Sequence, residues 1–128
     1  MVPLDSGTVH DQRGAPLATV RAESFFAVDM RVGRVVTCES FPEARRPAYR
    51  MTIDFGRLGV RQSSARLTDR YTPEDLVGRL VIGVVNLPPR QIGPVRSEVL
   101  VLGAYERGTD AVALLAPDGE CEPGDRIG

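Results

Sequence analysis

The feature that most constrains the fold is a series of short β-type segments broken by glycine, proline and a single helix signal. Within residues 49–55, apolar and polar side chains alternate, which is typical of a strand with one buried face. The run at 80–85 is continuously apolar and β-branched, as expected for a strand buried on both faces. The sequence predicts strands at 29–39, 49–55, 60–65, 80–85 and 97–103, with a further strand at 111–116.

The helix signal lies between the third and fourth predicted strands. Thr72 can cap the helix, Pro73 suits the first helical position, and Glu74 and Asp75 complement the positive end of the dipole. Gly78 is suited to ending the turn. A short helix is therefore expected immediately before the strand at 80–85.

This order of elements predicts an all-β fold. Five short strands with a helix between the third and fourth indicate an OB-fold, a five-stranded Greek-key barrel, here with N- and C-terminal extensions. An SH3-like barrel lacks a helix at that point. The sequence predicts a tail at residues 1–22 and the domain at residues 23–128. A chain of 128 residues is long enough to bury a small core.

Three local expectations follow from single residues. Ser24 could cap a short helical turn through Phe25, Phe26 and Val28. Arg34 interrupts the alternation beside Gly33, which indicates either a β-bulge or a close backbone approach. Three prolines within 86–96 predict that this segment has no regular structure, because proline provides no ladder donor.

All 16 basic residues are arginine, and the net charge is −1. Either a coding bias or a use for guanidinium groups explains the absence of lysine. Residues 44–70 contain seven arginines and two acidic residues. This local excess of positive charge is compatible with an anionic partner and equally with a surface that only contacts solvent.

Catalytic and metal-binding readings are weak. His10 is the only histidine and lies in the predicted tail, and no phosphate-binding loop, zinc-protease or nucleophile-elbow motif occurs. Cys38 and Cys121 lack metal-ligand spacing, so we expect neither enzyme activity, nor a metal, nor a cofactor. No apolar run is long enough to cross a bilayer, and no export signal is visible, so the cytoplasm is the expected location.

An OB-fold places its ligand across strands two and three, between two flanking loops. Here the first loop carries Phe41, Pro42, Arg45 and Arg46, and the second spans 86–96. The predicted groove is both apolar and cationic. It suits a polypeptide segment or a folded RNA better than single-stranded nucleic acid, because aromatic residues for base stacking are scarce.

Five segments resemble the CsaA family of export-related chaperones. They are Phe41-Pro-Glu-Ala-Arg45, Ile53-Asp-Phe-Gly56, Gln62-Ser-Ser-Ala65, Val85-Asn-Leu-Pro-Pro-Arg90 and Ser97-Glu-Val-Leu-Val-Leu-Gly103. The resemblance implies a cytoplasmic OB-fold homodimer that binds unfolded or presecretory polypeptides, with dimer contacts from 24–28 and from the strands after Gly103. Related tRNA-binding domains carry Ser-x-Gly-Met, where this chain has Val99 and Leu100 in place of Gly and Met. They also favour His-Pro where this chain has Phe41-Pro42, and both departures favour the chaperone branch.

Two hypotheses about the site follow. The first is a polypeptide-binding groove formed by Phe41, Pro42, Arg45, Gln62, Asn86, Leu87, Pro88, Pro89, Arg90, Arg96 and Ser97. The second is a site for tRNA or another structured RNA formed by Arg45, Arg46, Arg61, Arg90 and Arg96. Both require residues 41–46 and 86–96 to be neighbours in space.

Overall fold

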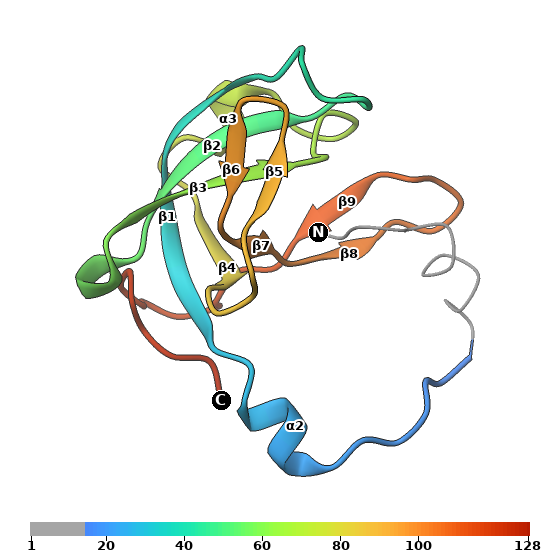
Figure 1. Cartoon of the computed structure of the whole chain (residues 1–128), viewed down its shortest axis with the longest axis vertical. Helices are drawn as coiled ribbons and strands as arrows, with labels where there is room; N and C mark the ends of the chain where they lie inside the picture. Colours follow the sequence, from blue (N-terminus) through green and yellow to red (C-terminus); the bar gives the residue numbers. More distant parts are fainter. Residues whose placement is uncertain (1–14) are drawn as a thin grey trace.

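The computed structural model describes residues 15–128, which contain short strands and even shorter helical turns (Figure 1). The helical elements are α2 (Ala22–Phe26), the 3-10 turn η1 (Gly56–Leu58) and α3 (Pro73–Leu76). The strands are β1 (Met30–Ser40), β2 (Tyr49–Asp54), β3 (Val60–Ala65), β4 (Leu80–Val84), β5 (Arg90–Ile92), β6 (Val95–Ser97), β7 (Leu100–Val101), β8 (Gly103–Tyr105) and β9 (Val112–Leu114).

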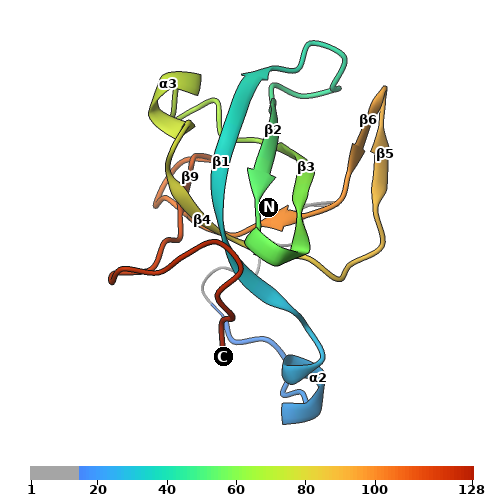
Figure 2. The same ribbon diagram turned by 90° about the vertical axis from the view of Figure 1, so that its left-hand side faces the viewer.

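Five of these strands form one antiparallel sheet in the order β3-β2-β1-β4-β7. The sheet curls so that its edge strand β3 meets the segment after β6, where the Glu98 amide donates to the Gln62 carbonyl oxygen at 2.9 Å. The result is a nearly closed barrel with α3 between β3 and β4 (Figure 2). The predicted OB-fold architecture is confirmed.

The barrel core follows the predicted alternation on β2. Tyr49, Met51 and Ile53 are buried, and Phe55, which follows the strand, is fully enclosed. A Cβ atom built on Gly33 of β1 would lie only 2.6 Å from Ile53 Cγ2 and from Phe55 Cε1. Of the two predicted alternatives at this point, the close approach is confirmed. The register shift lies further along β1, between Val35 and Thr37.

Helix α3 has the predicted capping box. The Asp75 amide donates to Thr72 Oγ1 at 3.3 Å, and the Thr72 amide donates to Asp75 Oδ2 at 2.9 Å. The hydrogen bond from Thr72 keeps the pKa of Asp75 below its usual value. Leu76 anchors the helix by being completely buried. Local hydrogen bonds and one apolar contact therefore suffice to hold four helical residues.

The prediction that residues 86–96 lack regular structure is wrong. Strands β5 and β6 form a hairpin in which Arg90 pairs with Ser97, Gln91 with Arg96, and Ile92 with Val95. The three prolines do not prevent it because two precede β5 and the third, Pro94, lies in the turn beside Gly93. The ladder therefore loses no donor.

Two further expectations differ from the structure. The strand predicted at 97–103 is divided among the end of β6, the two-residue β7 and the start of β8, because the chain turns to close the barrel. Ser24 lies inside α2 instead of capping it; the N-cap is Arg21, which makes no side-chain capping bond. The predicted tail at 1–22 falls mainly on residues 1–14, which lie outside the described part of the chain.

The C-terminal segment pairs with the start of β1. The Val32 amide donates to the Asp125 carbonyl oxygen at 2.9 Å, and the Gly124 amide donates to the Val32 carbonyl oxygen at 2.8 Å. The Ile127 amide donates to the Met30 carbonyl oxygen at 2.9 Å. Both views place the C-terminus beside α2, at the end of the barrel opposite α3 (Figures 1 and 2).

Candidate functional site

The loop between β1 and β2 lies directly against the β5–β6 hairpin. A Cβ atom on Gly93, in the hairpin turn, would lie 3.4 Å from Glu43 Cβ and 4.0 Å from Phe41 Cζ. Figure 2 shows the loop passing above the barrel toward the tip of the hairpin. The expected proximity of residues 41–46 and 86–96 therefore holds for the tip of the hairpin. Asn86 bonds to Ala27 and Asp29, so the start of the second segment lies toward the other end of β1.

Phe41 is not an exposed wall of this surface. Its side chain is only 3% exposed and forms a small second core with Ala48 and Val95, against which Ala44 and Ile92 pack. The sequence could not show this, because Val95 belongs to a hairpin that was predicted to be irregular. Phe41 joins the loop to the hairpin and so fixes the distance between them, while the neighbouring Pro42 is exposed.

Asn86 also holds neighbouring segments together. Its Oδ1 accepts from the Asp29 amide at 2.8 Å, and its Nδ2 donates to the Ala27 carbonyl oxygen at 2.8 Å. The amide group thus ties the start of the β4–β5 loop to the junction between α2 and β1. Next to it, the Val85 amide donates to the Asp29 carbonyl oxygen at 2.9 Å. Asn86 therefore holds this loop in place, and its side chain is exposed as well.

Arg61, which was assigned to the predicted RNA site, also makes a bond within the barrel. On β3 it is paired with Ile53, whose side chain is in the core, so Arg61 faces inward at the end of the barrel. Its Nη1 donates to the Val85 carbonyl oxygen at 2.9 Å, and the residue is half-buried. Arg61 therefore supports the start of the β4–β5 loop and is not a fully exposed cation.

Ser97 and Gln62 lie along the seam where the barrel closes. Ser97 Oγ accepts from the Ser64 amide at 3.0 Å, and Glu98 Oε1 accepts from the Gln62 amide at 3.0 Å. Along this edge of β3, the side-chain oxygens of Ser97 and Glu98 thus accept from backbone amides, where a neighbouring strand would offer carbonyl oxygens. The Gln62 side chain is exposed beside this seam. The role of Glu98 was missed, because nothing local in the sequence shows which distant amide a carboxylate will meet.

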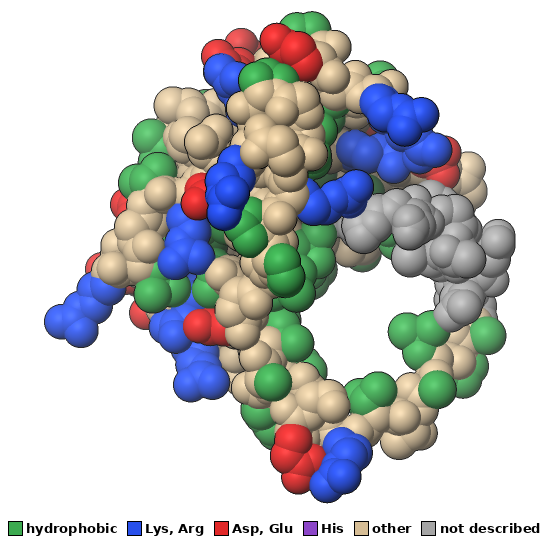
Figure 3. Space-filling view, in the orientation of Figure 1, with side chains coloured by type: hydrophobic (Ala, Val, Ile, Leu, Met, Phe, Trp, Pro, Cys, Tyr) green, Lys and Arg blue, Asp and Glu red, His purple; other side chains and the backbone are tan. Residues whose placement is uncertain are grey.

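The remaining predicted residues are exposed on the loop and the hairpin side of the molecule. They are Pro42, Arg45, Arg46, Leu87, Pro88, Pro89, Arg90 and Arg96. The four arginines form no ion pair with any residue between 15 and 128. In Figure 3, basic side chains are scattered around the face on which the hairpin lies. The structure thus keeps an apolar and cationic surface, although a smaller one than predicted.

Titration and metal chemistry add little to this surface. Burial raises the pKa of the Cys38 thiol to about 11, with Glu39 and Glu74 adding to the effect. Across residues 15–128, no group of three histidine, cysteine or acidic side chains could hold a metal ion. No helix in that part of the chain is long and apolar enough to cross a membrane. His10 lies outside the described residues.

The barrel, its flanking loop and its hairpin define an OB-fold domain with a candidate binding surface at one side. The chain matches the family model described as "Putative tRNA binding domain" over residues 30–126. It is 47% identical to the chaperone CsaA from Bacillus anthracis str. Ames, with a TM-score of 0.81, covering 87% of this chain and 100% of that one. The chain belongs to the tRNA-binding domain family and, within it, to the CsaA proteins.

Two other similar proteins have different names. The CsaA chaperone protein from Picrophilus torridus is 44% identical, with a TM-score of 0.80, over 86% of this chain and 100% of that one. Methionine–tRNA ligase 1 of Sorangium cellulosum (strain So ce56) is 41% identical over 113 residues. That match covers 88% of this chain and 16% of the ligase, so the chain spans a small part of that relative.

Proposed function

We propose that this protein is a non-catalytic, export-related chaperone that binds unfolded or presecretory polypeptide segments on the surface shared by the β1–β2 loop and the β5–β6 hairpin. One observation carries the proposal. Leu87 is 44% exposed and is followed by the exposed Pro88 and Pro89 and then by Arg90, which has no ion pair within the described residues. Similarity to proteins named CsaA chaperones supports the same function.

The surface suits an extended chain for two physical reasons. Proline fixes the backbone at Pro42, Pro88 and Pro89, so little conformational entropy is lost when these residues contact a ligand. The guanidinium groups of Arg45 and Arg90 offer several donors each, which peptide carbonyl oxygens can accept. Apolar contact would provide affinity without requiring one particular sequence.

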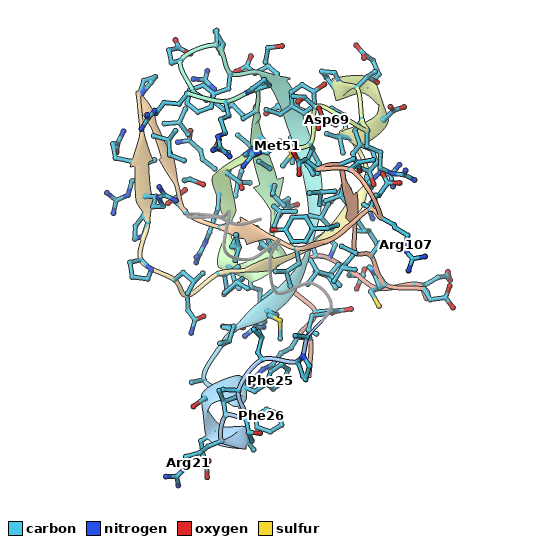
Figure 4. The ribbon with its side chains drawn as sticks, turned by 90° about the vertical axis from the view of Figure 1, so that its right-hand side faces the viewer. Arg21, Phe25, Phe26, Met51, Asp69 and Arg107 are labelled. Carbon is cyan, nitrogen blue, oxygen red and sulfur yellow. The ribbon has the colours of Figure 1, made fainter. Side chains whose placement is uncertain are left out.

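Fluorescence anisotropy with fluorescein-labelled, reduced and carboxymethylated α-lactalbumin tests this proposal. We expect saturable binding by the unmodified protein, and at least a ~10-fold loss of affinity for Leu87→Ser combined with Arg90→Ala, because both apolar area and donors are removed. Arg107→Gln serves as the control, since Figure 4 shows Arg107 on the side of the barrel away from the hairpin. No saturable binding, or equal binding by the double variant, would contradict the proposal.

A second candidate function is recognition of tRNA or another structured RNA. The matched family and the similar ligase favour it, and Arg45, Arg46, Arg90 and Arg96 are exposed for phosphate contacts. Arg61, the fifth arginine of the hypothesis, is half-buried and donates one bond to the Val85 carbonyl oxygen, which leaves its other donors for a phosphate. A gel-shift titration with total tRNA between 50 and 200 mM salt (~4 phosphate contacts) should then show a logarithmic slope of roughly −3 to −4. A flat salt dependence would contradict RNA binding.

We further propose that the protein acts as a homodimer in the cytoplasm. Phe25 and Phe26 of α2 are 45% and 62% exposed, and α2 buries none of its residues within the described chain. Apolar surface of this kind is stabilised by a partner. The free cysteines Cys38 and Cys121 are consistent with a reducing compartment.

A further inference from the structure

The four arginines of the candidate surface have no ion pair within the described residues. Arg31, Arg50 and Arg70 each have an acidic partner, at 2.6 Å from Asp29, 2.8 Å from Glu39 and 3.0 Å from Glu106. By contrast, Arg45 and Arg46 on the loop, and Arg90 and Arg96 on the hairpin, have no acidic partner among residues 15–128. Other exposed arginines, such as Arg57 and Arg107, also lack an ion pair within the described chain, so these four stand apart only because they lie on two segments that meet, the loop and the hairpin.

Acidic side chains near these arginines are few. Residues 86–97 contain none, and residues 41–48 contain only Glu43. Glu98, which follows the hairpin, directs its carboxylate to the Gln62 amide at 3.0 Å. The combined surface therefore keeps an excess of positive charge, although the whole chain has a net charge of −1.

The use of arginine favours anions that present two oxygens side by side, such as a carboxylate or a phosphate. A guanidinium group presents a planar fork of donors that matches the two oxygens of a carboxylate, and the chain has no lysine to act as a simple point charge instead. Leu87, Pro88 and Pro89 precede Arg90 directly, so apolar and cationic contacts follow one another along the chain. A complementary ligand would present apolar side chains and carboxylates at the same spacing.

We infer that this surface selects acidic polypeptide segments, in which aspartate or glutamate residues are interspersed with apolar ones. The inference rests on the proposed polypeptide-binding function and names its substrate class. Two observations favour a polypeptide over a nucleic acid. Phe41 is the only aromatic residue in the two segments and is buried, so unpaired bases have no stacking platform there. The chain's pI of about 5.8 also contrasts with the strongly basic character typical of nucleic-acid-binding domains.

Three fluorescein-labelled peptides of identical length test the inference. Each has the same leucine and alanine framework, with four variable positions occupied by glutamate, glutamine or lysine. At low salt we expect the glutamate peptide to bind about 10-fold more tightly than the glutamine peptide, because several exposed arginine–carboxylate contacts each contribute a modest amount. The lysine peptide should bind most weakly, and the glutamate preference should shrink as salt increases.

Matched variants assign the preference to this surface. Arg45→Gln combined with Arg96→Gln should remove most of the difference between the glutamate and glutamine peptides. Arg57→Gln combined with Arg107→Gln removes the same charge from exposed positions elsewhere and should leave the difference unchanged. Circular dichroism of both double variants shows whether the barrel is retained.

The outcomes separate this inference from the function on which it rests. Equal affinity for all three peptides, or tightest binding of the lysine peptide, would overturn acidic selection and leave polypeptide binding intact. Binding of tRNA without binding of any peptide would overturn both. If the control pair of substitutions reduced the glutamate preference as strongly as the loop–hairpin pair, the assignment to this surface would be wrong.

Discussion

At the scale of single residues, the barrel is sensitive where backbone and side chains meet most closely. Gly33 of β1 is such a position, because its missing Cβ leaves room for the Phe55 ring and for Ile53. Both neighbours are fully buried, so neither can move into solvent. The closed core therefore requires glycine at this position, because a larger side chain would overpack the core and lower the stability of the fold.

Gly33→Ala should lower the free energy of unfolding by about 1–3 kcal/mol, because the added methyl group would lie 2.6 Å from Ile53 Cγ2 and from Phe55 Cε1. Urea denaturation followed by circular dichroism measures the change. Gly119→Ala is the control, since a Cβ there meets nothing within 4 Å and the backbone is not left-handed. Equal stability of the two variants would mean that the core relaxes around the methyl group.

The raised pKa of Cys38 predicts that its thiol reacts slowly. Burial raises its pKa from 9.0 to about 11, so at pH 8 only about one thiol in a thousand is the reactive thiolate, compared with roughly one in ten at the ordinary pKa. Alkylation of Cys38 by iodoacetamide should therefore be about 100-fold slower in the folded protein than in urea. The folded rate should still be rising at pH 10. Peptide mass spectrometry measures both rates, and a plateau below pH 9 would contradict the raised pKa.

At the scale of secondary-structure elements, the sequence predicted what depends on local pattern and missed what depends on distant partners. The alternation at 49–55 and the capping box at Thr72 and Asp75 correspond closely to β2 and α3. The β5–β6 hairpin was missed because the positions of the prolines relative to the ladder matter more than their number. The burial of Phe41 depends on that hairpin, so it could not be predicted either.

The same limit applies to the candidate site. The sequence identified both segments and their proximity, because an OB-fold places these two loops on one side. It could not distinguish exposed residues from those that hold the loops in place. Arg61 and Asn86 bond to Val85, Ala27 and Asp29, which lie 24 to 59 positions away along the chain. Only the folded structure shows that these two side chains also hold the β4–β5 loop in place.

Asn86 should hold the β4–β5 loop to the junction of α2 and β1. Asn86→Ala removes one acceptor and one donor, so we expect a loss of about 1–2 kcal/mol in unfolding free energy and faster hydrogen exchange at the Asp29 amide. Gln91→Ala is the matched control, because its side chain bonds only to Gly93 within the same hairpin. Unchanged exchange at Asp29 would show that the junction holds without Asn86.

At the scale of the whole molecule, the C-terminal segment meets the start of β1 at one end of the barrel. The C-terminal segment bonds to Met30 and Val32, and Arg31 Nη1 donates to the Gly124 carbonyl oxygen at 3.1 Å. Arg31 also bonds to Asp29, which keeps the pKa of that carboxyl below its usual value. This end of the barrel is thus well connected up to residue 29, and α2 extends beyond it (Figures 1 and 4).

Helix α2 needs a partner that the described chain does not provide. It has five residues, no side-chain cap and no buried residue, and isolated helices of this length are unstable in water. Phe25 and Phe26 pack edge to face, with their ring centroids 5.2 Å apart, yet both remain exposed. Leu17 and Val20, just before the helix, are also exposed, so apolar groups line this whole segment. In the proposed homodimer, these residues are the candidate contacts, because a two-fold axis would bring the same segment of both chains together.

Light scattering at micromolar concentration should therefore give a mass close to twice 13.9 kDa. Phe25→Ser combined with Phe26→Ser should shift the mass to that of a single chain, because the two rings provide the largest apolar area on α2. Val60→Ser combined with Val77→Ser, at exposed positions on β3 and after α3, should leave the dimer intact. A single-chain mass for the unmodified protein would contradict dimerisation, whereas dissociation in the control variant alone would place the interface on the barrel instead of on α2.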